Sequence, residues 1–237
     1  MVYGWLKQAP DLLYPPFCLL CGQRSHTVQE LCAACSRDLP WNRHACERCA
    51  APLPEEAPNK YCGRCLQSPP AWDGAASPLL YAWPLDQLLQ RFKFNNDLAT
   101  GRLLGELLAD FLAAGPTVKP ELLIPVPLHS LRLRERGFNQ ALELARPVSR
   151  RLRLSIAHDL CVRVKHTQVQ SKLDAAERHR NLRDAFAVRR SVMKAHVAIL
   201  DDVVTTGTTA AALSKTLRQA GAATVQVWSL ARAARLS

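Results

Sequence analysis

Residues 197–213, VAILDDVVTTGTTAAAL, decide the fold class of this chain. A short apolar strand ends in two acids, and a loop of threonines around one glycine then opens directly into a helix. Ligands of parallel sheets bind beyond the carboxyl ends of the strands, where loop hydroxyls and helix N-terminal N–H groups suit a phosphate. Asp201 and Asp202 would repel that phosphate, so they should face ribose hydroxyls or a magnesium ion. Gly207 allows the backbone to approach such a ligand closely.

Strands and helices alternate outward from this stretch, which predicts an α/β domain with a mainly parallel sheet and helices on both faces. Pro147 should kink or break its helix, Gly221 should cap the last helix, and Cys161 should be a small buried residue on a strand. Residues 68–78, rich in Pro, Gly and Ala, are typical of a linker or an extended lead-in. We expect strands at 78–83, 121–127, 196–202 and 224–232, and helices over 85–114 with a break near 95–96, over 138–152 and over 208–220.

Eight of the nine cysteines form four C-x-x-C pairs in the first third of the chain. Two such turns complete a tetrahedral four-cysteine zinc site, which is closed to water and serves folding rather than catalysis. Disulfides and an iron–sulfur cluster are the alternatives, and an interleaved cross-brace is the alternative to pairing in chain order. We therefore expect a double zinc-ribbon domain over 1–68 and the α/β domain over 69–237. In chain order the ligands are Cys18, Cys21, Cys32 and Cys35 for one zinc, and Cys46, Cys49, Cys62 and Cys65 for the other.

The net charge of +11 is concentrated in one segment. Between Leu131 and Lys194 there are 16 Lys and Arg residues against 6 Asp and Glu. Such a segment attracts phosphate, on a nucleotide or on a nucleic acid backbone, and a merely solvated surface is the alternative. No apolar run approaches the ~18 residues of a membrane span, and the N-terminus lacks the features of a signal peptide. We therefore expect a cytoplasmic protein without membrane insertion.

Two acids followed by V-x-T-T-G-x-T resemble the phosphoribosyl pyrophosphate (PRPP) motif of type I phosphoribosyltransferases. The resemblance implies that Asp201 and Asp202 bind the 2′- and 3′-hydroxyls of the ribose, with magnesium accompanying PRPP. The loop is not a Walker A motif, because the required Gly-Lys-Thr/Ser is missing. The residues that would wrap the 5′-phosphate are Val204, Thr205, Thr206, Gly207, Thr208 and Thr209.

Two further segments, IPVPLHSLRLRERGFNQALELA at 124–145 and VRVKHTQVQSKLDAAERHRNLRDAF at 162–186, resemble the ComF family when taken with the four C-x-x-C pairs. The resemblance covers essentially the whole chain. In one departure, residues 92–97 read FKFNND where the family pattern has a glycine before the acid, which bears on Lys93 and Asp97. By position, the pyrophosphate loop would be 127–137, with Arg132, Arg134, Arg136 and Gly137, and the hood over the site would include Arg163, Lys165, Gln170 and Arg178.

ComF proteins are associated with DNA uptake and natural transformation, so the resemblance implies a protein that binds PRPP or a related ribose phosphate and handles incoming single-stranded DNA. An active magnesium-dependent phosphoribosyltransferase on a nucleobase-like or amine acceptor is one alternative. A scaffold that docks a helicase-like competence protein through the zinc ribbon is another. For single strands, stacking on aromatic side chains is expected, yet only Phe138 and Phe186 lie in the basic segment.

Overall fold

A parallel sheet forms the centre of the protein in a computed structural model that describes residues 16–233 except 26, 28, 116–118 and 165–184. Within these residues the sheet has six strands in the order β1-β8-β7-β3-β4, with β2 also paired to β8, and every pairing is parallel. Residues 197–200 are fully buried, because helices cover both faces of such a sheet. The strands are β1 (Gly74–Ala76), β2 (Leu79–Leu80), β3 (Leu122–Pro125), β4 (Ser155–Ile156), β7 (His196–Val204) and β8 (Thr224–Arg232).

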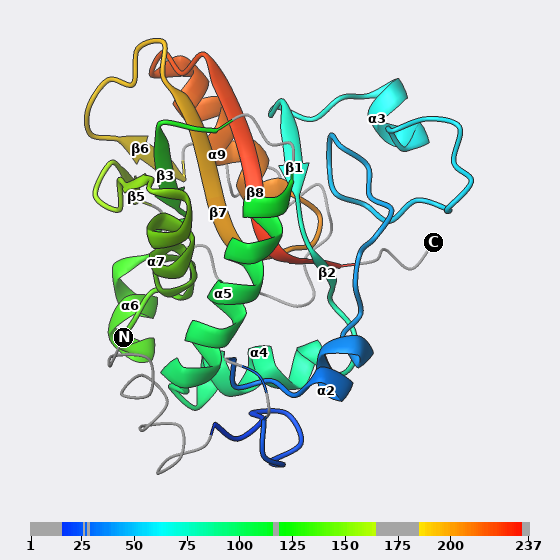
Figure 1. Ribbon diagram of the computed structural model, residues 1–237. Helices are drawn as coiled ribbons and strands as arrows, with labels where there is room; N and C mark the ends of the chain where they lie inside the picture. Colours follow the sequence, from blue (N-terminus) through cyan, green and yellow to red (C-terminus); the bar gives the residue numbers. More distant parts are fainter. Residues whose placement is uncertain (1–15, 26, 28, 116–118, 165–184, 234–237) are drawn as a thin grey trace, which may run out of the picture.

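Helices α5 (Leu98–Ala114) and α7 (Gln140–Leu152) lie on one face of the sheet, and α9 (Thr208–Gln219) lies on the other (Figure 1). Of the kink or break expected at Pro147, the break is wrong, since α7 runs through the proline, and the kink stays a prediction. The proline ring is buried against α5, where a Cβ atom on Gly105 would come within 2.8 Å of Pro147 Cγ. Close packing of the two helices thus offsets the hydrogen bond that proline removes.

The predicted break near Asn95–Asn96 is confirmed, because α4 (Leu85–Phe94) ends there and α5 begins at Leu98. Asn96 has φ +53°, in the left-handed region that asparagine tolerates better than most residues. Asn96 stands where the family pattern has a glycine, and it keeps the conformation that a glycine would adopt. Asp97 then caps α5, accepting hydrogen bonds from the Thr100 N–H (3.0 Å) and hydroxyl (2.7 Å).

Of the two expectations for residues 68–78, the extended lead-in is confirmed and the linker is wrong. β1 adds to the sheet beside β8, and Trp72 is 5% exposed. The predicted loop 127–137 also contains a short helix, α6 (Ser130–Arg136), which Gly137 ends at φ +80°. Beyond the sheet, β5 (Cys161–Arg163) and β6 (Phe186–Val188) pair antiparallel. Cys161 is buried on β5 as predicted, and burial raises the pKa of its thiol to about 12.

The cysteine-rich part, with the short helices α2 (Ala33–Asp38) and α3 (Gly63–Gln67), packs directly on the sheet edge. The Ala75 N–H donates to the Glu47 carbonyl at 2.9 Å, and Trp41 forms a β-bridge with Leu79. One apolar core therefore runs from the cysteines into the sheet, and the domain boundary at residue 68 stays a prediction. Within the described ranges, the helices are all too short or too polar to cross a membrane.

Candidate phosphate-binding site and metal centres

The cysteines gather into two separate groups of four. In each group the sulfurs lie within 4.8 Å of one another, with 3.9 Å between the Sγ atoms of Cys21 and Cys32 and 3.7 Å between those of Cys49 and Cys62. A disulfide requires about 2.05 Å, whereas four sulfurs around zinc at about 2.3 Å stand about 3.8 Å apart. Chain-order pairing is thereby confirmed, and the cross-brace is excluded. The groups are Cys18, Cys21, Cys32 and Cys35, and Cys46, Cys49, Cys62 and Cys65.

Backbone N–H groups favour ionisation of one thiol in each site, whereas burial raises the pKa of the Cys35, Cys49 and Cys65 thiols as long as no cation is bound. Burial of Cys18 opposes ionisation of its thiol, but hydrogen bonds from the backbone of Cys21 and Cys32 prevail and lower the pKa to about 6. In the second site burial likewise opposes ionisation of Cys62, and the Cys65 backbone helps to lower its pKa to about 7. Thiolates are the form that binds zinc, so the donor set fits two closed structural zinc ions.

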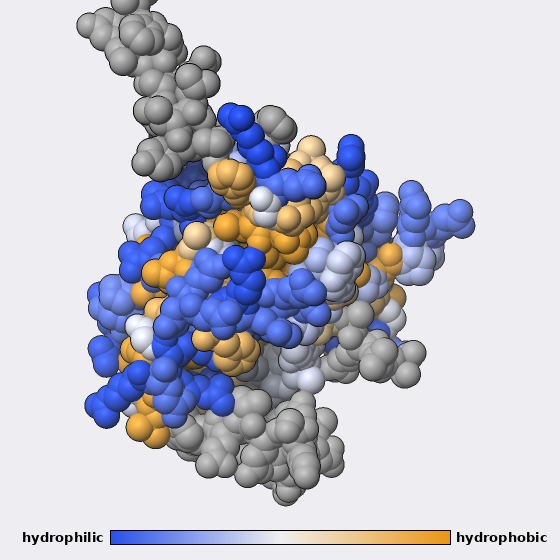
Figure 2. Space-filling view, turned by 90° about the horizontal axis from the view of Figure 1, so that it is seen from below, coloured by the Kyte–Doolittle hydropathy of each residue, from blue (hydrophilic) through white to orange (hydrophobic). Residues whose placement is uncertain are grey.

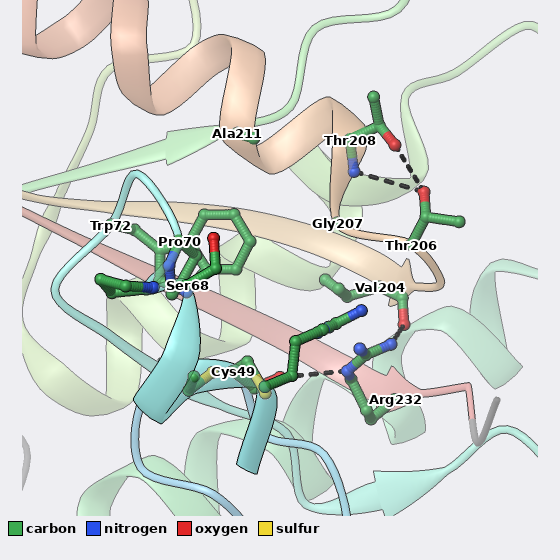
Figure 3. A pocket seen from close by; sticks show the side chains of 13 residues that line it. Cys49, Ser68, Pro70, Trp72, Val204, Thr206, Gly207, Thr208, Ala211 and Arg232 are labelled. Atoms are coloured by element: carbon green, nitrogen blue, oxygen red, sulfur yellow. Dashed lines mark hydrogen bonds between the residues drawn. The ribbon is translucent and has the colours of Figure 1, made fainter. Parts of the chain in front are cut away.

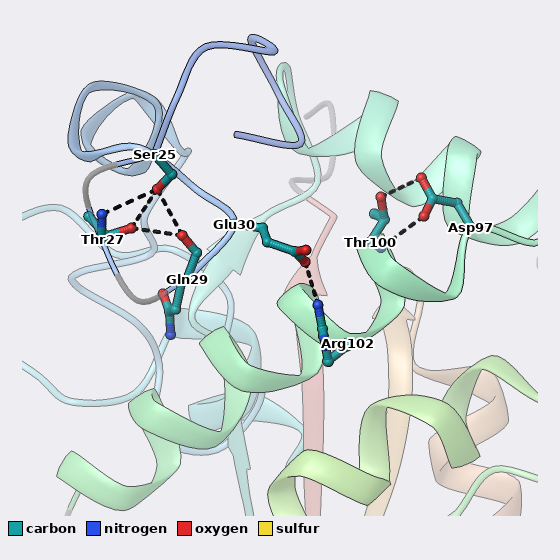
Figure 4. Close-up of polar contacts among 7 residues, drawn as sticks. All are labelled: Ser25, Thr27, Gln29, Glu30, Asp97, Thr100 and Arg102. Carbon is teal, nitrogen blue, oxygen red and sulfur yellow. Dashed lines mark hydrogen bonds and ion pairs between the residues drawn. The ribbon is translucent and has the colours of Figure 1, made fainter. Parts of the chain in front are cut away.

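Polar contacts tie the first zinc knuckle to α4 and α5. Arg91 of α4 donates to the backbone carbonyl of Leu19, inside the first C-x-x-C turn, and pairs with Asp97 at 2.8 Å. Figure 4 shows a second link, in which Arg102 of α5 pairs with Glu30 at 2.6 Å. The position of the first zinc site is therefore fixed relative to the end of α4.

One buried arginine joins the second zinc knuckle to the threonine loop. Arg232, 2% exposed at the end of β8, donates from Nε to the Cys49 carbonyl at 3.0 Å and from Nη1 to the Val204 carbonyl at 2.7 Å. Nη1 also donates to the Thr205 carbonyl. A planar guanidinium can serve acceptors on both sides at once, so the loop backbone and the zinc knuckle share one anchor.

Gly207 brings the threonine loop against Trp72 at the edge of the zinc ribbon. The glycine has φ +79°, and a Cβ atom there would lie 2.9 Å from Trp72 Cη2. The Trp72 indole is itself held, because Nε1 donates to the Arg48 carbonyl at 2.6 Å. Figure 3 shows Trp72, Gly207 and Arg232 around one cavity of about 260 Å³, which Arg64 of the zinc ribbon also lines.

The loop leads into α9 without a capping side chain from its N-cap residue, since that residue is Gly207. The hydroxyls of Thr206 and Thr208 lie 2.6 Å apart, and the Thr208 N–H lies 3.4 Å from Thr206 Oγ1 (Figure 3). The start of α9 thus brings together the first-turn N–H groups, the positive end of the helix and the hydroxyls of Thr206 and Thr208. This arrangement suits an anion.

The two acids lie at the end of β7, as the sequence predicts. Lys93 Nζ contacts Asp202 Oδ2 at 2.6 Å, and both side chains are mostly buried. Burial and the Asp202 carboxylate raise the pKa of Asp201 to about 7, although Lys93 and Arg163 favour its ionised form. The pair therefore carries less negative charge than two free carboxylates, and a nearby cation already balances part of it.

Basic side chains of the predicted pyrophosphate loop converge on these acids. Arg132 and Arg136, four residues apart on α6, line a second cavity of about 490 Å³ together with Lys93. Burial lowers the pKa of Arg136, and the Asp202 carboxylate opposes that shift. Arg134 is exposed and is not among the lining residues of that cavity, because it lies on another side of the short helix.

The predicted hood begins on β5. Burial lowers the pKa of Arg163. The charge of Arg132 lowers it further, and the Asp201 carboxylate opposes the shift, so Arg163 lies near both residues. The other three candidates of the hood, Lys165, Gln170 and Arg178, lie outside the described residues.

The sequence analysis left open or missed three features of this site. The role of Lys93 stayed open because of the asparagine before Asp97. For Trp72, core packing beside the metals is the expected fate of a tryptophan so close to the cysteines, and its burial agrees, but its contact with Gly207 was not foreseen. Arg232 was missed at the end of an apolar strand. A charged residue closing the run TVQVWSLAR was the available signal, since arginine is rarely buried without partners.

The chain is similar to curated proteins over most of its length. Residues 9–66 match the family described as double zinc ribbon domain, which names the metal. The chain is 38% identical to "Competence protein F" of Haemophilus influenzae over 226 residues, covering 91% of this chain and 96% of that protein. It is 39% identical to "DNA utilization protein YhgH" of Shigella flexneri over 206 residues, covering 85% and 90%.

Among solved structures, the chain is similar to the hypoxanthine phosphoribosyltransferase of Trypanosoma cruzi at 16% identity and a TM-score of 0.36, covering 57% of this chain and 74% of that one. The predicted fold class, an α/β domain with a mainly parallel sheet flanked by helices and preceded by a Cys-rich double zinc ribbon, is confirmed by the parallel sheet, the two cysteine sites and the family match.

Proposed function

Because this chain belongs to the ComF family of competence proteins, we propose that it binds PRPP or a related ribose phosphate and acts on incoming single-stranded DNA during DNA uptake. The names of its relatives connect the family with competence and with DNA utilization. On the strength of the family resemblance, the proposal places this action in the cytoplasm and includes a helicase-like partner protein.

The ribose-phosphate proposal rests on one observation: hydrogen-bond acceptors for a sugar and donors for a phosphate lie next to each other at the end of β7. Asp201 and Asp202 offer acceptors to sugar hydroxyls, and residues 204–209 offer N–H and hydroxyl donors to a phosphate. A ribose 5′-phosphate has the complementary groups, because its hydroxyls donate hydrogen bonds and its phosphate oxygens, a few bonds away, accept them. The fit therefore needs both halves of the motif in place.

The pyrophosphate end of PRPP would face Lys93, Arg132 and Arg136. Magnesium bound to the pyrophosphate would reduce its charge and could reach the Asp201 and Asp202 carboxylates, which are oxygen donors of the kind magnesium prefers. The chain's own residues would then hold the sugar, neutralise the diphosphate and exclude water.

An active phosphoribosyltransferase is the second candidate, favoured by the cations beside the acids. In that reaction the bond from ribose C1 to the pyrophosphate oxygen breaks, and a bond from C1 to the acceptor forms. Arg136 and Lys93 would stabilise the negative charge that builds on the departing pyrophosphate. Release of pyrophosphate from PRPP, with and without nucleobases or amines, measures this activity.

Calorimetric titration with PRPP and magnesium tests the binding proposal. We expect saturable binding by the intact protein and none by a variant that combines Asp201→Asn with Asp202→Asn. Asp159→Asn is the control, because Asp159 is an exposed acid paired with Arg190 outside the site. No binding of PRPP or any ribose phosphate by the folded wild-type protein would refute the proposal.

A further inference from the structure

The last residue of α4, Phe94, turns its ring to solvent beside the acid site. It is 70% exposed, although its neighbour Lys93 is turned inward to Asp202. The ring lines the cavity of about 490 Å³, with Asn96 next to it. The face seen in Figure 2 is mostly hydrophilic, with hydrophobic side chains gathered among charged ones. An exposed aromatic ring that lines a cavity among basic side chains suits a ligand with an apolar, flat part.

Arg136 adds a cation above this ring. Its guanidinium carbon lies 5.6 Å from the centroid of Phe94. Together with Lys93 and Arg132, the cavity has three basic side chains against one acid, Glu135. The cavity therefore combines a stacking surface with a net positive charge.

The aromatic residues of the basic segment do not provide such a surface. Phe186 is 5% exposed, and Phe138 is half-buried with its ring centroid 5.4 Å from that of Phe92 in the core. Both are engaged in packing. The fold instead brings Phe94, from a different part of the chain, to the basic segment.

We propose that this cavity binds one nucleotide unit of single-stranded DNA, with its base stacked on Phe94 and its phosphate held by Arg132 and Arg136, so that the DNA phosphate takes the place of the pyrophosphate of PRPP and the two ligands exclude each other there. The inference rests on the proposed function for its ligand and adds the binding residues. Pyrophosphate alone would bind through the cations, and an aromatic ring would add nothing to its binding free energy. Asn96 beside the ring supplies an amide that can hydrogen-bond a base edge. A paired base cannot reach the ring, so duplex DNA does not satisfy the site.

Fluorescence anisotropy with a labelled oligo-dT strand of about 20 nucleotides tests the inference on the full-length, zinc-loaded protein. We expect Phe94→Ala to weaken binding about tenfold, since base stacking on one aromatic ring is commonly of that size, and Phe94→Trp to restore it. The matched control is Trp83→Ala, two residues before the start of α4, with 68% exposure and no part in the lining of the cavity. We expect it to change affinity less than twofold.

Salt dependence separates stacking from charge. Phe94→Ala should leave the slope of affinity against salt concentration unchanged, whereas Arg132→Gln should reduce that slope by about one phosphate contact.

PRPP titration of Phe94→Ala should match the wild type. If Phe94→Ala binds the strand as tightly as the wild type, the stacking site is refuted while ribose-phosphate binding stands. If PRPP and DNA affinity fall together, Phe94 supports the acid site instead, and the inference is equally refuted. No DNA binding by the wild type would refute it together with the DNA half of the proposed function.

Discussion

Replacing Gly207 by alanine tests how tightly the zinc ribbon and the threonine loop are fitted together. At φ +79° an alanine pays about 1–2 kcal/mol for the left-handed conformation. Its Cβ atom would also lie 2.9 Å from Trp72, whose ring is buried and held by its bond to Arg48. Overpacking of this kind adds about 1–3 kcal/mol. We therefore expect Gly207→Ala to lower the free energy of unfolding by about 3 kcal/mol in total.

For a chain of 237 residues this loss corresponds to a fall of about 6–12 °C in unfolding temperature. Thermal unfolding followed by circular dichroism measures it. Gly22→Ala is the matched control, because Gly22 has φ +74° and no atom within 4 Å of its added Cβ. That variant should carry the backbone cost alone. Gly63→Ala, with no positive φ and open space, should be close to neutral.

A double-mutant cycle with Trp72→Phe isolates the contact. The smaller ring removes the atoms that meet the new Cβ, so Gly207→Ala should be less harmful in that background by about 1–2 kcal/mol. Equal losses for Gly207→Ala and Gly22→Ala, with no coupling to Trp72, would refute the argument that the ribbon braces the loop.

Two further predictions concern the acids and the metals. Asp201 has a pKa of about 7 in the folded protein against about 3.9 unfolded, so its contribution to stability is present at low pH and is lost as the pH rises through 7. Asp201→Asn should therefore stabilise the ligand-free protein, by on the order of 2 kcal/mol near pH 8 after solvent screening and by less near pH 5.5. Denaturant unfolding at both pH values measures this difference in the free energy of unfolding. A difference that does not change with pH would contradict the prediction. Removing zinc with a chelator should lower the unfolding temperature and weaken PRPP binding together, because Arg232 joins the Cys49 carbonyl to the loop. Calorimetry before and after zinc is restored measures this, and unchanged PRPP affinity of a folded, metal-free protein would speak against the link.

Local patterns carried most of the fold prediction. The strand, loop and helix around Asp201 follow one another within 17 residues, and each C-x-x-C pair lies close to its partner in the chain. Their structures depend on neighbouring residues, so the sequence reveals them. β8 was predicted at its observed bounds because its burial is continuous and its flanks are clear.

Residues that act through distant contacts were beyond the same reasoning. β1 has only three residues, and its pairing partner on β8 lies about 150 positions away, so nothing local marks Gly74–Ala76 as a strand. Phe94 and Arg136 lie on different helices about 40 positions apart in the chain, so only the folded structure shows that they meet. The break considered at Pro147 was wrong for the same reason, since the packing that keeps its helix continuous comes from Gly105 on α5.

The contacts of the zinc ribbon bear on what it does. On α4, Arg91 donates to the first knuckle, and two residues later Lys93 pairs with Asp202. On β8, Arg232 joins the second knuckle to the loop carbonyls. The second zinc site is thus one side chain away from the threonine loop, and the first is connected to Asp202 through two side chains of the same helix, α4. A ribbon used only to dock a partner would need neither arginine, so these contacts favour a ribbon that positions the binding residues, whatever else its outer surface contacts.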